Sequence, residues 1–245
     1  MEWSEEGIIV GTRRHGETDV ILEVLTAGHG RHLGLVKGGR SRRLRPILQP
    51  GNTLSLTWRA RLHEHLGNFR VEPIVERSGM LIASPLGAFG LALAGAHLRL
   101  LPERDPHPRL YEALWLMLDQ FDRPALAAEM MARFEVLLLD ELGFGLDLES
   151  CAATGSRDEL IYVSPKSGRA VSREAGEPYR ERLLPLPAFL AGPPTGRAAP
   201  ARLQEAFLLT GYFLERHVFD AKGEGLPEVR LSFLRALSGA VETAT

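Results

Sequence analysis

The sequence predicts an α+β protein in which a small β-barrel precedes an α-helical domain. Residues 7–74 read as short apolar strands separated by turns, whereas after Ser84 the apolar residues recur every three or four positions. A non-periodic segment rich in Gly and Pro interrupts the helical part. We therefore expect a barrel domain at 1–80 and a helical domain at 81–245, with an insert at about 146–199.

Five apolar segments predict the strands of the barrel: GIIVGTRR, TDVILEVLT, RHLGLVKG, NTLSLTWRARL and FRVEPIV. In the fourth segment Leu54, Leu56 and Trp58 occupy alternate positions, a period that is typical of a strand with one buried face. Trp58 is therefore expected in the core rather than on a surface that stacks bases. Five short strands with Gly-rich turns favour a closed barrel over a sandwich.

Five segments with helical periodicity follow: SPLGAFGLALAGAHLRLL, PRLYEALWLMLDQF, PALAAEMMARFEVLLLDELGF, ARLQEAFLLTGYFLERHVF and PEVRLSFLRAL. Ser84 and the proline after it suit an N-cap and first turn, and Pro124 marks another helix start. The apolar stripes predict a helical core rather than a cofactor site; examples are Met130, Phe134, Leu137 and Leu138. Within the insert, DELIYVSPKSGRAVS predicts a hairpin that turns at 165–168.

Composition and charge exclude several classes of protein. The net charge is −2, and no apolar run approaches the roughly 20 residues of a membrane span. The first residues, MEWSEEGII, carry acids where a secretory signal carries Lys or Arg. Cys151 is the single cysteine, so no internal disulfide framework is possible. We expect a cytoplasmic, nucleoid-associated protein without a membrane partner.

Positive charge is concentrated in one interval of the chain. No acidic residue lies between Glu23 and Glu64, whereas the rest of the chain is acidic on balance. Such asymmetry favours a polyanionic partner, DNA or RNA, over a solvated loop whose charge only aids solubility. The cations of the interval are Arg31, Lys37, Arg40, Arg42, Arg43, Arg45, Arg59 and Arg61, with nothing in the interval opposing them.

The segment KGGRSRRLRP, residues 37–46, holds five of these cations. Gly38 and Gly39 would let backbone N–H groups approach a phosphate, and Pro46 and Pro50 would hold the segment extended between strands. We therefore predict a DNA-binding site whose arginines contact phosphates without reading the base sequence. Its predicted residues are Arg31, Lys37, Gly38, Gly39, Arg40, Arg42, Arg43, Arg45, Arg59 and Arg61.

No motif in the sequence predicts an enzyme. A Walker A sequence is absent, and His63 and His65 have the alternate spacing of a strand rather than the helical spacing of a zinc-binding pair. Cys151 has no histidine near it in the sequence to activate it as a nucleophile. The acidic residues at 140–147 are explained by a solvated helix end. We expect a non-enzyme without catalytic residues, metal or cofactor.

Several motifs occur in a specific order along the chain. An opening strand leads to a Gly-Glu-Thr-Asp turn at 16–19, and a later strand ends in Lys37-Gly38 before the basic loop and a Leu-Gln-Pro step at 48–50. FEVLLLDELGFGLDLESC then forms a helix that runs towards a cysteine. In this order and spacing, which cover most of the chain, the sequence resembles the RecO family of bacterial recombination mediators.

This resemblance implies an N-terminal OB-fold, a helical domain and a small zinc-ribbon-like insert. It also implies binding of single- and double-stranded DNA, annealing of complementary strands, and action with RecR to load RecA onto strands coated by single-strand-binding protein. The C-terminal tail of single-strand-binding protein is expected to bind the helical domain. Candidates by residue type for that contact, which the sequence leaves unassigned, are Arg99, Arg133, Arg216 and Arg230.

The insert departs from the family at the zinc site, where many relatives carry two C-x-x-C pairs. Cys151 stands where the first pair begins, but Thr154 takes the partner position, and Ser172 and Ala175 stand where the second pair is expected. One thiol with alcohols cannot form a tetrahedral zinc site. We therefore expect a metal-free insert held by packing, with Cys151 buried as a small apolar residue.

One alternative class remains open, a protein-interaction adaptor whose basic loop binds acidic partners. An adaptor differs from a DNA-binding mediator in one measurable property. An adaptor alone would show no salt-sensitive retention of DNA.

Overall fold

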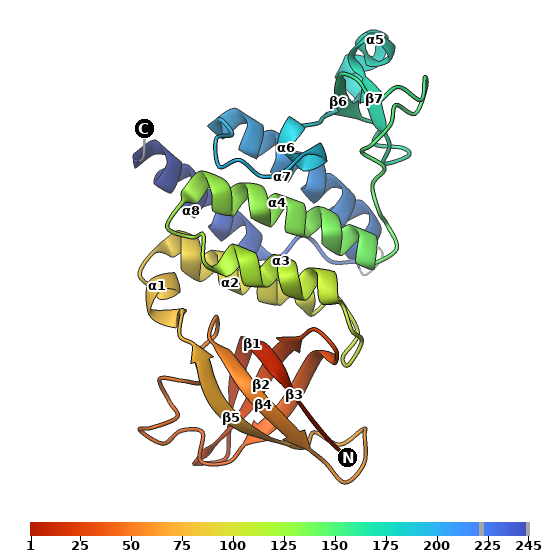
Figure 1. Cartoon of the computed structure of the whole chain (residues 1–245). Helices are drawn as coiled ribbons and strands as arrows, with labels where there is room; N and C mark the ends of the chain where they lie inside the picture. Colours follow the sequence, from red (N-terminus) through yellow and green to blue (C-terminus); the bar gives the residue numbers. More distant parts are fainter. Residues whose placement is uncertain (221–222, 244–245) are drawn as a thin grey trace. The chain divides into compact units, whose positions relative to one another are not determined.

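The computed structural model describes residues 1–220 and 223–243. The chain divides into two compact units, Met1–Asp119 and Gln120–Thr245. Figure 1 shows the strands of the first unit in red to orange and the helices of the second in green to blue. Within the described residues, no helix is both long enough and apolar enough to cross a membrane.

Five strands form a closed barrel in the first unit, which confirms the predicted architecture. Their order around the barrel is β1-β2-β3-β5-β4, and every neighbouring pair is antiparallel except β3 with β5. The strands are β1 Glu2–His15, β2 Asp19–Thr26, β3 Gly30–Val36, β4 Thr53–Arg59 and β5 Asn68–Val75. Each lies at or near a segment that the apolar pattern predicts.

The inward-facing side chains of these strands fill the barrel. Leu54, Leu56 and Trp58 on β4 are fully buried and belong to one core cluster, which confirms the predicted alternation. The indole N–H of Trp58 donates to the carbonyl of Leu66 at 3.0 Å. The polar atom of the ring is therefore satisfied while the ring itself packs in the core.

Three helices complete the first unit: α1 Ser78–Ile82, α2 Pro85–Leu98 and α3 Pro108–Leu118. The hydroxyl of Ser84 accepts a hydrogen bond from the N–H of Gly87 at 3.1 Å, which confirms the predicted N-cap of α2. α2 packs against β1, and α3 packs against β2. The barrel and these helices therefore share one compact unit.

A buried arginine joins the barrel to α3. Arg77 is 4 % exposed, donates to the hydroxyl of Thr53 at 2.8 Å and pairs with the carboxylate of Asp119 at 2.5 Å. Because these contacts bind the barrel to residues beyond α2, the compact unit extends to Asp119. The division into domains 1–80 and 81–245 stays a prediction.

The segment with His63 and His65 is a turn, and its prediction as a strand is wrong. The guanidinium of Arg104 donates to the carbonyls of both histidines, at 2.8 Å for His65. It also lies 5.7 Å from the ring centroid of Trp58. A side chain distant in the sequence thus satisfies carbonyls that strand pairing would otherwise engage.

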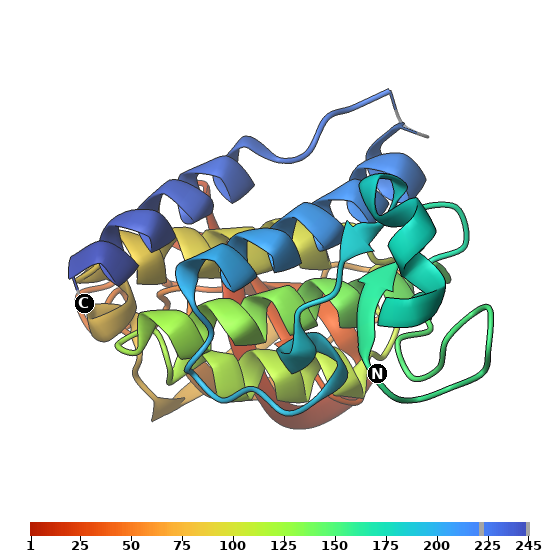
Figure 2. The same cartoon turned by 90° about the horizontal axis from the view of Figure 1, so that it is seen from above.

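Three longer helices form the core of the second unit: α4 Pro124–Glu141, α7 Pro200–Leu214 and α8 Glu228–Thr243. α4 packs against both α7 and α8, and Figure 2 shows the blue α7 and the dark blue α8 running alongside one another. Phe134 and Leu138 of the predicted stripe are buried, and its other two members are half-buried. Shorter helical turns are η1 Glu177–Arg182, α6 Ala188–Ala191 and η2 Glu215–Phe219.

A buried ion pair ties α4 to α8. A carboxylate oxygen of Glu135 lies 2.8 Å from Nε of Arg230, and the two side chains are 0 % and 7 % exposed. Arg230 also donates to the carbonyl of Phe207 at 2.7 Å, and the hydroxyl of Thr210 donates to Glu135. These extra hydrogen bonds offset part of the desolvation cost that burial of two charges carries.

The insert contains a small three-stranded sheet, with β6 Leu160–Val163, β7 Ala170–Ser172 and β8 Leu184–Pro185 in the order β7-β6-β8. β6 and β7 pair as the predicted hairpin. Gly168 in its turn has a φ of +68°, a conformation that favours glycine. A single helical turn, α5 Arg173–Gly176, follows β7.

The positions at which the family resemblance implies zinc ligands do not fit a zinc ion in this chain. The N–H of Ser172 donates to Sγ of Cys151 at 3.3 Å. Burial opposes ionisation of Cys151, but hydrogen bonds from Ser172 and Thr154 lower the pKa of the thiol to about 6. Ala175 has no ligand atom, and among the described residues no group of three His, Cys, Asp or Glu is placed to hold a metal. Cys151 is buried as predicted, but its thiol is hydrogen-bonded rather than purely apolar.

Candidate nucleic-acid interface

The basic segment, residues 37–46, folds as a series of turns after β3. The N–H of Arg45 donates to the carbonyl of Ser41 at 2.9 Å, and the N–H of Leu48 donates to that of Leu44 at 2.9 Å. Leu48 is part of the barrel core, and Leu44 packs against it. The prediction of an extended segment is therefore wrong, because these two leucines fold the chain back onto the barrel.

The turn between β1 and β2 fastens the start of the basic segment. The N–H of Gly38 donates to the carboxylate of Asp19 at 2.9 Å, and the N–H of Arg40 donates to the carbonyl of Thr18 at 2.9 Å. The guanidinium of Arg40 donates to the carbonyl of Glu17. The hydrogen bonds from Gly38 and Thr18 lower the pKa of Asp19 below its ordinary value. The Gly-Glu-Thr-Asp turn thus positions the cations that follow β3.

Gly38 and Gly39 have structural roles that differ from the predicted one. Gly38 has a φ of +63°, which favours glycine, and its N–H is already engaged. A Cβ on Gly39 would lie 2.9 Å from Cβ of Val20 and 3.0 Å from Cδ1 of Leu48. The N–H of Gly39 donates to the carbonyl of Val36 at 3.2 Å. Since neither N–H is free to approach a phosphate, we leave both glycines out of the proposed contact surface.

A cleft of about 590 Å³ lies between the basic segment and the outer face of β1, β4 and β5. Strand pairing sets Ser4 opposite Thr57 and Thr57 opposite Arg70, and the hydroxyl oxygens of Ser4 and Thr57 are 3.0 Å apart. This barrel cleft therefore has a floor of short polar side chains. The cations that line it are Lys37, Arg43, Arg59 and Arg70, all of them exposed.

Arg70 lines the barrel cleft although it lies outside the acid-free interval that selected the other cations. The signal that could have found it is the alternation along β5. Phe69 is buried in the barrel core, so the next residue points outward. Strand pairing then brings Arg70 beside β4.

Two of the predicted arginines have acidic partners, which corrects the expectation of unopposed charge. Arg31 lies 3.0 Å from Glu23, with both side chains 12 % exposed, so it does not reach the surface of the cleft. Arg59 lies 2.8 Å from Glu2, its direct partner in the pairing of β1 with β4. The interval lacks acids in the sequence, but antiparallel pairing brings them in from outside it.

The other predicted arginines are exposed but do not line the barrel cleft. Arg42, Arg45 and Arg61 are exposed and form no ion pair within the described part of the chain. Arg40 is also exposed, but its guanidinium is held by the β1–β2 turn. The structure therefore brings Lys37, Arg43 and Arg59 together with Arg70, leaves the other four arginines outside the lining of the cleft, and sets Arg31 apart.

Aromatic side chains contribute little open surface to the barrel cleft. Phe69 lines it but is only 5 % exposed. Trp3 is half-buried and stacks on His29 at a centroid distance of 4.1 Å. Because stacking of bases needs an exposed ring, phosphate contacts are the interaction that this surface offers most.

The four arginines considered for a peptide contact are all engaged within the chain. Arg99 pairs with Glu23 at 2.7 Å, and Arg230 pairs with its partner in α4 as described above. Arg133 donates to the carbonyl of Phe189 at 2.8 Å. Arg216 donates to the carbonyl of Pro165 at 2.9 Å. Residue type alone therefore does not identify a free cation here.

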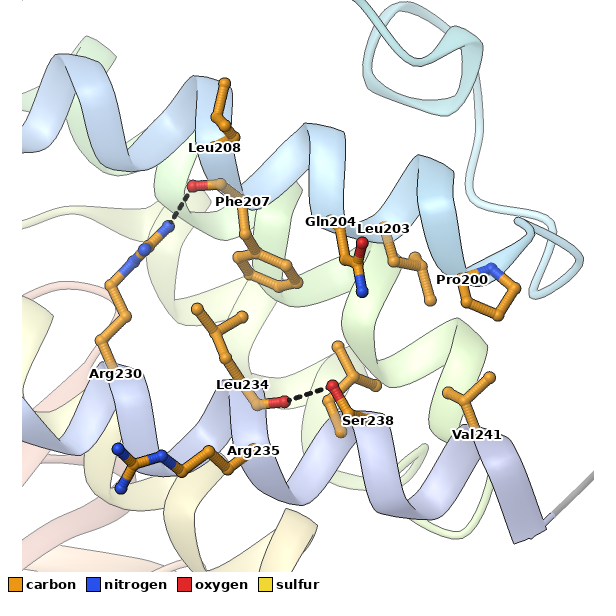
Figure 3. Close-up of a pocket in the computed structure, with 11 residues that line it drawn as sticks. Pro200, Leu203, Gln204, Phe207, Leu208, Arg230, Leu234, Arg235, Ser238 and Val241 are labelled. Carbon is orange, nitrogen blue, oxygen red and sulfur yellow. Dashed lines mark hydrogen bonds between the residues drawn. The ribbon is translucent and has the colours of Figure 1, made fainter.

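A separate groove of about 670 Å³ lies between α7 and α8 in the second unit. Figure 3 shows Phe207 of α7 facing Leu234 of α8, with the side chain of Arg235 extending from α8 at the lower left. Arg235 is exposed and makes no ion pair within the described residues. The groove thus combines an apolar lining with one free cation.

The barrel and the helical unit define the class of the protein, which is an α+β protein with an N-terminal OB-fold. Residues 1–76 match the family model described as Recombination protein O N terminal, and residues 88–224 match the one described as Recombination protein O C terminal. The chain therefore belongs to the RecO family, as the order of its motifs indicates.

Curated relatives extend this match over nearly the whole chain. Proteins named DNA repair protein RecO are 56 % identical in Brucella abortus (strain 2308), over 98 % of each chain, and 59 % identical in Mesorhizobium japonicum, over 97 % of this chain and 94 % of the relative. The relative of that name in Sinorhizobium medicae is 56 % identical over 100 % of this chain and 98 % of its own length. Membership of this family indicates a role in DNA repair.

Proposed function

We propose that this chain is a DNA-binding recombination mediator that holds DNA through the barrel cleft and the basic segment. The observation that carries the proposal is a set of exposed cations without acidic partners at one cleft. Lys37, Arg43 and Arg70 line the cleft, and none of the three forms an ion pair within the described residues.

The chemistry of the barrel cleft supports contact with the DNA backbone rather than with bases. Guanidinium and ammonium groups bind phosphate oxygens and release counterions, so binding is sensitive to salt and tolerant of sequence. The hydroxyls of Ser4 and Thr57 add donors for phosphate or sugar. Such a surface takes single-stranded and double-stranded DNA alike.

The mediator activities that we propose need no bond chemistry. A cationic surface that neutralises two backbones raises the rate at which complementary strands meet, so annealing without ATP follows from binding. We further propose that the protein acts with RecR to load RecA on strands coated by single-strand-binding protein. A strict nucleotide requirement, or strand cleavage in magnesium, would count against this function.

For the C-terminal tail of single-strand-binding protein, we propose the groove between α7 and α8. An acidic tail with bulky apolar side chains matches an apolar lining beside the free cation Arg235. The test is the affinity of a tail peptide for R235E. We expect a loss of about tenfold relative to the unaltered protein, while DNA affinity stays unchanged.

The decisive experiment for the main proposal is a DNA-binding titration over a range of salt. The unaltered protein is compared with a variant in which Arg40, Arg42, Arg43 and Arg45 are replaced by Ala. We expect the slope of log K against log salt to flatten by about 2–4 units, at roughly 0.7–0.9 per lost contact. Unaltered affinity and slope in the folded variant would favour the adaptor, whose basic segment binds acidic proteins instead.

A further inference from the structure

The end of the β1–β2 hairpin carries a second group of basic side chains outside the barrel cleft. Arg13, Arg14 and His15 are exposed, and neither arginine forms an ion pair within the described residues. Strand pairing continues up to His15 opposite Asp19, so these side chains stand on regular backbone rather than on a loose loop. None of them lines the barrel cleft.

The basic segment links this hairpin end to the barrel cleft. At its start, the N–H of Arg40 donates to the carbonyl of Thr18 at 2.9 Å, and the guanidinium of Arg40 donates to the carbonyl of Glu17. Further along, Arg43 and Leu44 line the barrel cleft. The basic segment therefore places one arginine, Arg40, at the hairpin end and another, Arg43, at the barrel cleft.

The two places are well separated along β1. Ser4 lies in the barrel cleft, and Arg13 lies nine positions further along the same strand, which corresponds to at most about 30 Å at ~3.3 Å per residue. The strand is irregular between Ile9 and Gly11, and this shortens the path. The basic segment contacts the hairpin end at Arg40 and the cleft at Arg43, so it connects the two places.

The local charge at the hairpin end is positive on balance. The acids of the turn are Glu17 and Asp19, and the carboxylate of Asp19 already accepts hydrogen bonds from Gly38 and Thr18. Both carboxylates keep their negative charge, and the three arginines Arg13, Arg14 and Arg40 outnumber these two acids. Positive charge that no protein group neutralises attracts a polyanion.

We infer that the hairpin end binds the phosphate backbone of a second DNA strand while the barrel cleft holds the first. The inference rests on the proposed function, since it needs a strand in the cleft. With the cationic basic segment between them, both backbones are held on one barrel while their mutual repulsion is reduced. Annealing then takes place between two strands held by one barrel.

The test is the retention of a second strand by a complex that already holds a first. A single-stranded oligonucleotide of about 12 nucleotides, the size that one OB-fold covers, is immobilised and saturated with protein. After washing, a labelled strand of non-complementary sequence is added, and its retention is measured. The proteins compared are the unaltered chain, R13A/R14A, and the control R157A/K166A, which removes two exposed, unpaired cations from the insert.

We expect R13A/R14A to bind the first strand within about twofold of the unaltered protein. Retention of the second strand and the rate of annealing of complementary strands should fall about tenfold or more, whereas the control variant should match the unaltered protein. R13K/R14K should restore retention, since it restores the charge. Circular dichroism verifies that all variants are folded.

Three results would overturn the inference in distinguishable ways. If the unaltered protein does not bind the first strand, the proposed function fails together with the inference. If it binds the first strand but R13A/R14A retains the second strand normally, only the inference fails. If R13A/R14A loses the first strand as strongly as the second, the hairpin end is a continuation of one DNA path and not a second one.

Discussion

Two places in this chain use arginine in opposite ways, the barrel cleft of the first unit and the helical core of the second. In the first unit Arg43 and Arg70 face a cleft and have no acidic partner among the described residues. In the second unit Arg230 is buried against Glu135, and Arg133 donates to the carbonyl of Phe189. The same side chain is therefore left open to solvent at the barrel cleft and satisfied internally in the helical core.

This difference shows why a count of charges does not locate a binding surface. An arginine that is paired and buried contributes to folding, and an external phosphate cannot reach it without breaking that pair. An exposed, unpaired arginine contributes little to stability but is ready to neutralise a phosphate. We therefore expect substitution of the buried, paired arginines to lower stability, and substitution of the exposed, unpaired arginines to weaken DNA binding without lowering stability.

The largest expected effect is on the stability of the second unit. Replacing Arg230 with Met leaves Glu135 buried without its counter-charge, and we expect the free energy of unfolding to fall by about 3–5 kcal/mol. Urea unfolding followed by circular dichroism measures the change. Arg235→Met, which removes an exposed cation from the same helix, should stay within about 0.5 kcal/mol of the parent. Equal losses in the two variants would break the comparison.

The next effect is a pH dependence that belongs to the first unit. Burial lowers the pKa of His32 from 6.5 to about 4, so the unfolded chain binds a proton between these values and the folded chain does not. Stability should therefore decrease as the pH falls from 6.5 towards 4, by up to about 3 kcal/mol. Tryptophan fluorescence follows this unit, because Trp3, Trp58 and Trp115 all lie in it.

His32→Gln is the variant that tests this assignment, and His15→Gln, at an exposed position, is its control. The first change should flatten the dependence on pH between 6.5 and 4, although its stability at neutral pH is also altered. The second should leave the dependence as it is. A parental dependence in His32→Gln would assign the proton to another group.

A smaller effect separates the positioning of the cations from their charge. Asp19→Ala removes an acid, so charge alone predicts tighter DNA binding. The structure predicts the opposite, because Asp19 holds Gly38 at the start of the basic segment, and we expect DNA affinity to fall about three- to tenfold. Tighter DNA binding by Asp19→Ala would mean that the hydrogen bond between Gly38 and Asp19 is not needed to position the basic segment for DNA.

The smallest effect comes from the acid inside the barrel cleft. Glu2 pairs with Arg59 at 2.8 Å, and phosphate has to compete with it. Glu2→Gln should therefore raise DNA affinity about two- to threefold at low salt, with little change in stability. Glu2→Gln and Asp19→Ala each remove one negative charge. If both variants raised DNA affinity, the proposed role of Asp19 would be contradicted.

Local patterns predicted much of the fold. The alternation around Trp58 identified the inner face of β4, and Ser84 and Pro124 identified helix starts. These signals are readable because each depends on residues only a few positions apart. The family resemblance supplied the overall order of the parts.

Long-range contacts account for what the sequence did not predict. The pairing of Arg59 with Glu2 and the place of Arg70 in the cleft depend on the register between strands. The turn at His63 depends on the distant Arg104. The fold of the basic segment depends on Leu48 finding the barrel core. None of these contacts can be predicted from the periodicity of neighbouring residues.

The central claim is that the free cations of the barrel cleft hold DNA, and the most direct test removes three cations from each unit. The cleft variant is K37A/R43A/R70A, and the matched control in the second unit is R157A/K166A/R235A. Binding of a mixed-sequence oligonucleotide is titrated over salt for both. We expect the slope of log K against log salt to flatten by about 2–3 units in the cleft variant and by less than about 0.5 in the control. Equal slopes in the two folded variants would contradict the claim.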